Sequence, residues 1–310
     1  MREAHYVDVK GTESRVGLIG VGTMGIHALS MLVDSGYDVV ACDLEACARE
    51  RARERGAVAV DRPRMVAEKA RTVLLALPGP PEVRAVVMGD EGVLTGARWD
   101  RGRVIIDMST VDPETTLQMA AEAAEIGVDY LDAPILGRPS AAGHWVLPVG
   151  GNPTSVARCR PVLEVLASKV LHVGPLGSGN KLKLLNALMF AAINAITAEM
   201  MAISVKAGFS PKVLYETIAE SEAATVSGLF KEVGPKIVAR DFTPVFPIDL
   251  LCKDNGLAIA MARSCGAPPI LANTVQVINE LATARGWGGQ DTSAVVKVYE
   301  ALLDGQESAT

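Results

Sequence analysis

Apolar and polar positions follow two successive patterns along the chain. Up to about residue 176, short apolar runs alternate with amphipathic segments, and beyond it almost every segment repeats its apolar positions at helical spacing. Strands that alternate with helices of this length predict an α/β domain with a mostly parallel, doubly wound sheet. We therefore expect a flexible N-terminal extension over 1–14, a sheet domain over 15–176 and an all-helical domain over 177–310.

The individual elements follow from the same patterns and from Gly and Pro punctuation. Strands are expected at 15–20, 37–43, 57–60, 72–77, 103–107, 128–132, 145–149 and 170–173. Helices are expected between them at 26–36, 45–55, 63–70, 82–88, 113–126 and 153–169, and then at 211–220, 223–240, 249–264, 269–285 and 291–304. A helix over 180–207 would span roughly 40 Å and link the two domains. Its surplus apolar surface predicts packing against other helices, including those of a second subunit.

Composition narrows the class of protein. Among 310 residues, 49% are hydrophobic and 21% charged, which is typical of a globular chain. The net charge of −6 favours neither nucleic acid nor an anionic membrane as a partner. Five scattered cysteines indicate a reducing compartment, so we expect a cytoplasmic protein. No apolar run of about 18 residues lacks a charge, so no membrane span is expected.

The first predicted strand leads into a G-x-G-x-x-G loop at residues 20–25, and an amphipathic helix follows. In such a loop the first glycine permits a tight turn, the second admits a pyrophosphate, and the third packs helix against strand. The helix N-terminus then faces the phosphate charge. The spacing predicts a dinucleotide site in which Gly20, Gly22, Thr23, Met24 and Gly25 contact the cofactor.

An acidic residue ends the second predicted strand. Asp43 lies 23 positions beyond Gly20, near the spacing of a carboxylate that binds the ribose 2′-hydroxyl, and Leu44 follows it. Such a carboxylate repels a 2′-phosphate, so NAD is expected in preference to NADP. Arg49 and Arg51 would weaken that preference. The alternative role for Asp43 is that it only caps the next helix.

Ligands of parallel sheets bind at the carboxyl ends of strands. The residues expected to line one crevice are therefore Asp43, Leu77-Pro78, Ser109-Thr110 and residues 132–137.

The linking helix carries two polar side chains within an apolar sequence. Lys183 and Asn186 are three positions apart and therefore share a face, whereas Lys181 does not share it. An ammonium can stabilise and protonate the oxygen formed when a carbonyl accepts hydride, and partial burial would lower its pKa toward the working range. The alternative is that Lys183 extends into solvent near the helix end.

Four segments together resemble the β-hydroxyacid dehydrogenase family, which includes 3-hydroxyisobutyrate dehydrogenase and tartronate semialdehyde reductase. They occur in the family's order and cover the chain from about Arg15 to the C-terminal region. They are the glycine loop at 17–25, Asp132-Ala133-Pro134-Ile135-Leu136-Gly137, the segment Gly177-Ser178-Gly179 with Lys183 and Asn186, and Lys253-Asp254-Asn255-Gly256-Leu257-Ala258.

The resemblance implies a Rossmann-like domain and a role for each matching residue. Lys183 would be catalytic, and Asn186 with the Gly137 backbone would hold the substrate. Leu77, Pro78 and Thr110 would contact the nicotinamide half of the cofactor, and Lys253 would approach it from the helical domain.

Two of these segments depart from the family pattern. Ala187 replaces its second asparagine, and Leu136 and Arg138 replace the serine and second glycine of its substrate loop. Arg138 is by chemistry a bidentate carboxylate ligand, so it is expected to replace the serine, to bind a second carboxylate, or to lie in solvent. Substrate identity therefore stays open.

These observations predict an NAD(P)-dependent oxidoreductase that interconverts a short, 3-hydroxyisobutyrate-like 3-hydroxy acid and its semialdehyde. The alternatives are a reductase of another small carbonyl or imine, and a non-enzymatic cofactor-binding protein, which the presence of Lys183 disfavours. No metal site is expected, because no His, Cys and Asp cluster has ligand spacing. A homodimer or homotetramer through the helical domain is expected.

Overall fold

A computed structural model of the chain describes residues 14–95, 102–221 and 227–304. The extension predicted over 1–14 lies outside these residues except for Ser14. The chain divides into two compact units between Lys183 and Leu184, within the long helix α7 (Ser178–Lys206). The boundary predicted between residues 176 and 177 falls about two turns earlier, near the start of that helix.

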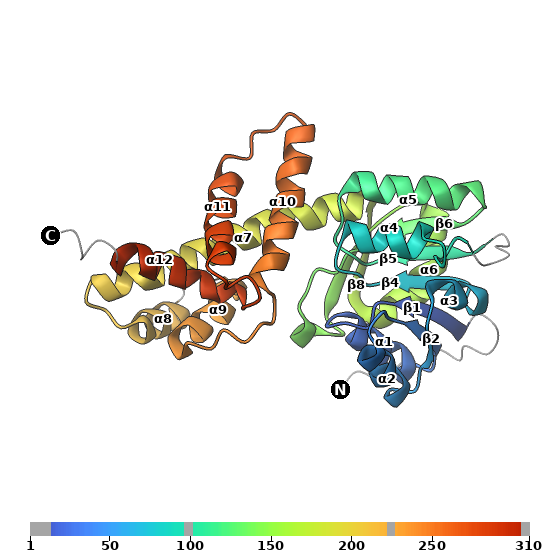
Figure 1. The fold of residues 1–310 in the computed structure, drawn as a ribbon, viewed down its shortest axis with the longest axis horizontal. Helices are drawn as coiled ribbons and strands as arrows, with labels where there is room; N and C mark the ends of the chain where they lie inside the picture. Colours follow the sequence, from blue (N-terminus) through green and yellow to red (C-terminus); the bar gives the residue numbers. More distant parts are fainter. Residues whose placement is uncertain (1–13, 96–101, 222–226, 305–310) are drawn as a thin grey trace. The chain divides into compact units, whose positions relative to one another are not determined.

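The first unit, which begins in blue in Figure 1, is built on a sheet. Its described strands follow the order β3-β2-β1-β4-β5-β6-β7-β8. The strands are β1 (Arg15–Ile19), β2 (Asp38–Cys42), β3 (Val58–Val60), β4 (Thr72–Leu75), β5 (Val104–Asp107), β6 (Asp129–Asp132), β7 (Trp145–Gly150) and β8 (Ala167–Gly174). The first six are parallel, β7 is antiparallel to β6, and β8 is parallel to β7. The prediction of a mostly parallel, doubly wound sheet is confirmed.

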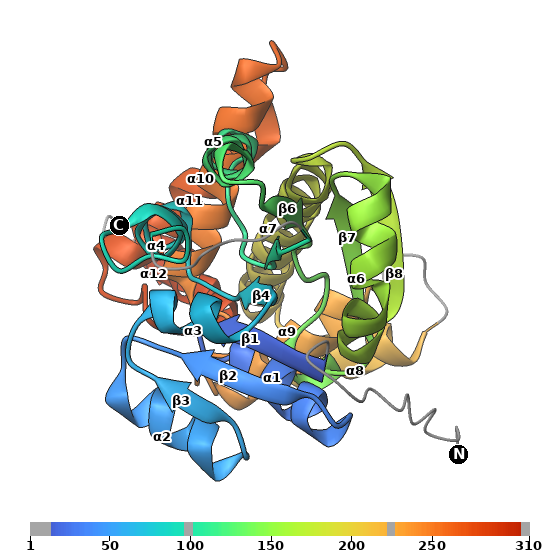
Figure 2. The same ribbon diagram turned by 90° about the vertical axis from the view of Figure 1, so that its right-hand side faces the viewer.

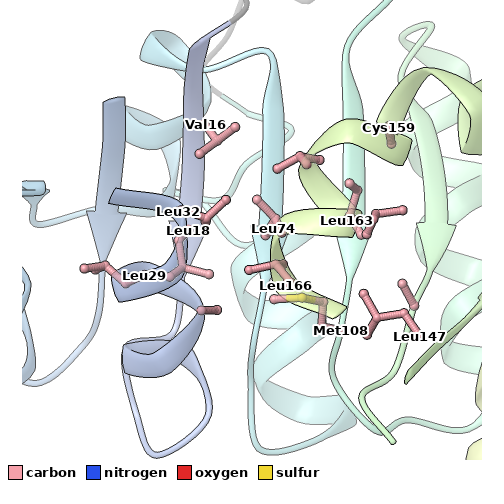
Figure 3. Packing of buried hydrophobic residues seen from close by; sticks show 14 of the residues in the cluster. Val16, Leu18, Leu29, Leu32, Leu74, Met108, Leu147, Cys159, Leu163 and Leu166 are labelled. Atoms are coloured by element: carbon pink, nitrogen blue, oxygen red, sulfur yellow. The ribbon is translucent and has the colours of Figure 1, made fainter. Parts of the chain in front are cut away.

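Helices cover both faces of this sheet (Figure 2). One face carries α1 (Gly25–Asp34), α2 (Ala46–Glu54) and α6 (Pro153–Leu166), and the other carries α3 (Pro63–Lys69), α4 (Pro80–Met88) and α5 (Pro113–Glu125). Figure 3 shows the first core, where Leu29 and Leu32 of α1 and Leu163 of α6 pack on strand residues such as Leu18 and Leu74. All five are fully buried, so apolar contacts hold β1 and the following helix α1 in place.

The second unit contains only helices among its described residues. They are the remainder of α7, α8 (Pro211–Glu220), α9 (Gly228–Ala239), α10 (Ile248–Ser264), α11 (Ile270–Ala284), a 3₁₀ turn η3 (Thr292–Val295) and α12 (Val296–Asp304). An apolar core that includes Met201, Phe230, Val233 and Val298 holds these helices together. The prediction of a helical C-terminal region is confirmed.

Three predicted boundaries were wrong. The helix expected to reach Lys169 ends at Leu166, because Ala167 already pairs with Trp145 of β7. The helix expected from residue 291 begins with the 3₁₀ turn η3, where Asp291 accepts hydrogen bonds from the amide and hydroxyl of Ser293. Helix α4 begins at Pro80 and not at residue 82, since proline is well suited to a first helical turn.

Helix α7 has 29 residues and a mean hydropathy of 1.7 over its most apolar window. Within the described ranges it is the one helix whose length and composition would fit a membrane span, and 44% of that window is buried inside the structure. Core helices of globular proteins have the same properties. The expectation of no span rested on Lys183 and Glu199, which interrupt the apolar run.

Candidate active site

Five parallel strands end in register at one edge of the sheet. Their last residues are Ile19, Cys42, Leu75, Asp107 and Asp132, which pair across the strands β2-β1-β4-β5-β6. The strand order reverses between β1 and β4, the position at which sheets of this type bind ligands. The structure therefore brings most of the predicted site to one edge: residues 20–25, Asp43, Leu44, Leu77, Pro78, Thr110, Gly137 and Arg138 all follow these strand ends.

The glycine loop has the shape that a dinucleotide requires. Gly20 has a φ of +93°, and a Cβ there would lie 2.3 Å from the Ala76 carbonyl oxygen. A Cβ on Gly25 would lie 1.9 Å from the carbonyl oxygen of Gly20, so the start of α1 packs directly on the loop. A Cβ on Gly22 would meet nothing within 4 Å. The loop is thus open only where a pyrophosphate would approach, and its residues fit this group.

Asp43 is bound to this loop through its side chain. Its Oδ2 accepts a hydrogen bond from the Val21 amide at 2.6 Å, and its Oδ1 accepts one from the Glu45 amide at 2.9 Å. The N-cap of α2 is Glu45, with no side-chain cap bond, so Asp43 does not act as the N-cap of that helix. Leu44, beside it, is 92% exposed and presents an apolar surface at the same edge.

Arg49 is held by the end of β2. Its Nη1 donates to the carbonyl oxygens of Asp43 and Leu44 at 2.8 and 2.9 Å, and its Nε lies 3.3 Å from Asp61 Oδ1. Arg51 is exposed. These contacts give Arg49 a role in fixing the backbone around Asp43.

The first turn of α7 is anchored by a buried carboxylate. Asp132 Oδ1 accepts a hydrogen bond from the Gly177 amide at 2.7 Å, and Oδ2 accepts one from the Asn180 amide at 2.8 Å. Burial raises the pKa of Asp132 from 3.8 to about 6, and these backbone hydrogen bonds oppose the rise. Negative charge is favourable at a helix N-terminus, so Asp132 ties the end of β6 to α7.

Lys183 lies in the second turn of this helix and contacts the predicted substrate loop. Its Nζ donates to the carbonyl oxygen of Ile135 at 2.8 Å, and the side chain is half-buried. Lys181 is exposed. Asn186 is exposed one turn further along α7, in the second unit, and its substrate role stays a prediction.

The substrate loop is shaped by Trp145 of β7. Leu136 exchanges backbone hydrogen bonds with Val146, and the buried Trp145 donates from Nε1 to the Arg138 carbonyl oxygen at 2.8 Å. Gly137 has a φ of +156°, and a Cβ there would lie 2.4 Å from Trp145 Cδ1. Trp145 therefore packs in the core and also fixes the backbone that carries Arg138, whose side chain is half-buried.

Asn180 is a residue that sequence reasoning missed. It is fully buried; its Oδ1 accepts from the Val111 amide and its Nδ2 donates to Thr116 Oγ1, both at 3.2 Å. It thus joins α7 to the segment that carries Thr110. The available signal was an asparagine in the first turn of an apolar helix, one turn before Lys183.

Lys253 belongs to the second unit. Its Nζ lies 2.6 Å from Asp254 Oδ1, and both residues belong to α10. Its approach to the cofactor stays a prediction. Among the described residues, no group of three or more His, Cys, Asp or Glu side chains is arranged to hold a metal ion.

Two family models match the chain. Residues 15–174 match the NAD binding domain of 6-phosphogluconate dehydrogenase. Residues 177–299 match the model described as NAD-binding of NADP-dependent 3-hydroxyisobutyrate dehydrogenase. NAD(P)-binding domains are therefore present over most of the chain.

Similar proteins match over almost the whole length. The 2-(hydroxymethyl)glutarate dehydrogenase of Eubacterium barkeri is 34% identical over 93% of this chain and 95% of its own. The 3-sulfolactaldehyde reductase of Escherichia coli K12 is 32% identical over 91% of this chain and 94% of its own. The crystal structure of a 3-hydroxyisobutyrate dehydrogenase from Salmonella typhimurium superposes with a TM-score of 0.83 at 28% identity, covering 92% of this chain and 99% of that one.

Proposed function

Because the chain belongs to the β-hydroxyacid dehydrogenase family, we propose that it interconverts a short 3-hydroxy acid and its semialdehyde with NAD(H). It is an NAD(P)-dependent oxidoreductase that acts on CH–OH groups. The non-enzymatic alternative is therefore excluded. The specific substrate, the choice of NAD and the roles of individual residues are the proposal.

The observation that carries the mechanism is the hydrogen bond from Lys183 Nζ to the Ile135 carbonyl. It holds an ammonium on a rigid helix beside the loop that follows β6. A bound dinucleotide would supply or accept the hydride. Lys183 donates the proton to the carbonyl oxygen during reduction, and its neutral amine accepts the hydroxyl proton during oxidation.

The choice of NAD rests on the charge at the end of β2. The Asp43 carboxylate is fixed by the Val21 amide and retains lone pairs for a ribose hydroxyl. A 2′-phosphate placed there would meet like charge. Arg49, which would otherwise attract such a phosphate, donates to the carbonyl oxygens of Asp43 and Leu44.

The substrate is proposed to carry an acidic group that Arg138 binds. A guanidinium matches a carboxylate bidentately, and Leu136 at the family's serine position lacks a hydroxyl. The Gly137 backbone and Asn186 would orient the same substrate. The relative named for 2-(hydroxymethyl)glutarate supports an acid with two carboxylates as a candidate.

A second candidate is a reductase of another small carbonyl compound or of an imine. The altered loop at Leu136 and Arg138 favours it. Lys183 weighs against the imine, because an ammonium suits an alkoxide better than an amine product.

We also propose that the protein is cytoplasmic and forms a homodimer or homotetramer through its helical domain.

The test is NAD reduction, followed at 340 nm, across a panel of acids. The panel contains 3-hydroxyisobutyrate, L-threonate and 2-(hydroxymethyl)glutarate, each repeated with NADP. We expect turnover with at least one acid and a higher kcat/KM with NAD. Inactivity with every hydroxy acid, together with reduction of other carbonyl compounds by NADH, would establish the second candidate instead.

A further inference from the structure

The Leu77–Pro78 turn has few backbone groups with which to hold its position. Residues 77–81 read Leu-Pro-Gly-Pro-Pro, so only Leu77 and Gly79 carry an N–H. Just before the turn, the Ala76 amide donates to the Ile19 carbonyl of β1. The Leu77 amide instead donates to a side chain, the Ser109 hydroxyl, at 2.9 Å. This hydrogen bond attaches the turn to the end of β5.

Ser109 is itself fixed by the last residue of β5. The Ser109 amide donates to Asp107 Oδ1 at 2.9 Å, which closes a tight turn over residues 107–109. Tyr130 of β6 donates its hydroxyl to Asp107 Oδ2, also at 2.9 Å. Ser109 is 3% exposed and Asp107 is fully buried, so no bulk water competes for these groups. A continuous polar chain therefore runs from β6 through β5 to the Leu77 amide.

This arrangement costs free energy. Burial is the largest cause that raises the pKa of Asp107, from 3.8 to about 6, and the charge of Asp132 raises it too. Hydrogen bonds from Ser109 and Tyr130 oppose the rise. A buried carboxylate is expensive compared with an apolar residue of similar size. Such cost at the ligand-binding edge of a sheet points to a functional reason for the group.

We propose that Asp107 and Ser109 are positioning residues that hold the Leu77–Pro78 turn against the nicotinamide half of the cofactor. The inference rests on the proposed function and on the family resemblance, which implies that Leu77 and Pro78 contact the nicotinamide half. Neither residue is proposed to touch the reacting atoms. Errors of about 1 Å in the placement of the ring can slow hydride transfer markedly, so a fixed turn has catalytic value.

Calorimetric titration of Ser109→Ala with two ligands tests this role. NADH contains the nicotinamide half, whereas ADP-ribose retains the adenosine and pyrophosphate and lacks the ring. The substitution removes the acceptor of the Leu77 amide. We expect NADH affinity to fall about tenfold, whereas ADP-ribose affinity stays within about twofold of wild type.

Ser155→Ala is the matched control. Ser155 is 4% exposed and donates its hydroxyl to Asp129 Oδ2 at 2.8 Å, at the amino end of β6, away from the ligand edge. It should leave both affinities unchanged. Asp107→Asn is a second variant that tests the proposal if Ser109→Ala fails to fold. It keeps the size of the Asp107 side chain and one acceptor oxygen. It should lower NADH affinity in the same direction and by less.

Equal losses for NADH and ADP-ribose in Ser109→Ala would overturn the proposal, because they would indicate general damage to the cofactor domain. Unchanged NADH affinity in both Ser109→Ala and Asp107→Asn would overturn it as well. Failure of the proposed function is separately visible, since wild-type protein would then oxidise none of the acids whatever the affinities of the variants.

Discussion

The ammonium of Lys183 donates a hydrogen bond to the carbonyl oxygen of Ile135 at 2.8 Å. A backbone carbonyl accepts a hydrogen bond but does not take up the proton. The contact therefore orients the Lys183 side chain and leaves it protonated. Replacing Lys183 by Met keeps the apolar stem and removes the amine. We expect kcat to fall by at least about 10²–10⁴-fold, the usual contribution of a general acid-base group.

Cofactor affinity distinguishes this effect from a loss of structure. NADH should bind Lys183→Met as it binds wild type, because the glycine loop and Asp43 belong to other elements of the first unit. Lys181→Met is the control: it removes an exposed ammonium two residues away and should leave kcat within about twofold. Near-wild-type turnover by Lys183→Met would disprove the assignment.

Much of the cofactor side of this site was predictable from local sequence. The spacing of Gly20, Gly22 and Gly25 reflects constraints within one strand-turn-helix unit, so it is visible without tertiary information. The same holds for Asp112, which is the N-cap of α5 and accepts a hydrogen bond from the Thr115 amide at 2.7 Å. Such motifs depend on contacts between residues that are close together in the sequence.

The substrate side depends on contacts between distant segments, which local patterns do not encode. The partner of Lys183 is a main-chain carbonyl, which any residue at position 135 would supply. The constraint on Gly137 comes from Trp145, and the role of Asn180 comes from Val111 and Thr116. The reversal of β7 relative to β6 is likewise a property of sheet pairing and not of the β7 sequence.

Arg138 offers a test of how the substrate is bound. Arg138→Gly should raise KM for the best acid substrate at least about tenfold, because a bidentate ion pair is lost. NAD affinity should stay within about twofold. Steady-state kinetics at saturating NAD, with NADH titrations alongside, measure both quantities. Arg158→Gly is the control, since Arg158 pairs with Asp129 at the amino end of β6. An unchanged KM in Arg138→Gly would place the guanidinium outside the substrate site.

The preference for NAD is expected to depend on the charge of Asp43. Asp43→Asn keeps the size of the side chain and removes the charge that would repel a 2′-phosphate. We expect the ratio of kcat/KM for NAD to that for NADP to fall about tenfold. Asp38→Asn, at the opposite end of β2, removes a carboxylate that pairs with Arg15 and should leave the ratio unchanged. A ratio equally insensitive to both substitutions would contradict the role of Asp43.

The buried Asp107 predicts a pH dependence of stability. Its pKa is about 6 in the folded protein against 3.8 for an ordinary aspartate, so folding favours the protonated form. Its contribution to stability is full below about pH 4 and is lost as the pH rises through 6. Between pH 7.5 and 5, wild type should therefore gain stability from this group. Urea unfolding measures the free energy of unfolding at both pH values. When the pH falls from 7.5 to 5, this free energy should rise less, or fall more, in Asp107→Asn than in wild type. An identical change in the two proteins would refute the prediction.

The apolar surface of α7 predicts how copies of the chain assemble. Met189, Ile196 and Ile203 lie seven residues apart and are 65%, 59% and 52% exposed, so they form one stripe on the helix. Burying such a stripe against a second helix removes apolar area from water, which drives association. Ile196→Glu should therefore convert the wild-type oligomer into a smaller species in sedimentation velocity. Lys181→Glu, which lies on the same helix outside the stripe, should leave the wild-type mass unchanged. A wild-type protein that sediments as a monomer at high concentration would contradict assembly through this face.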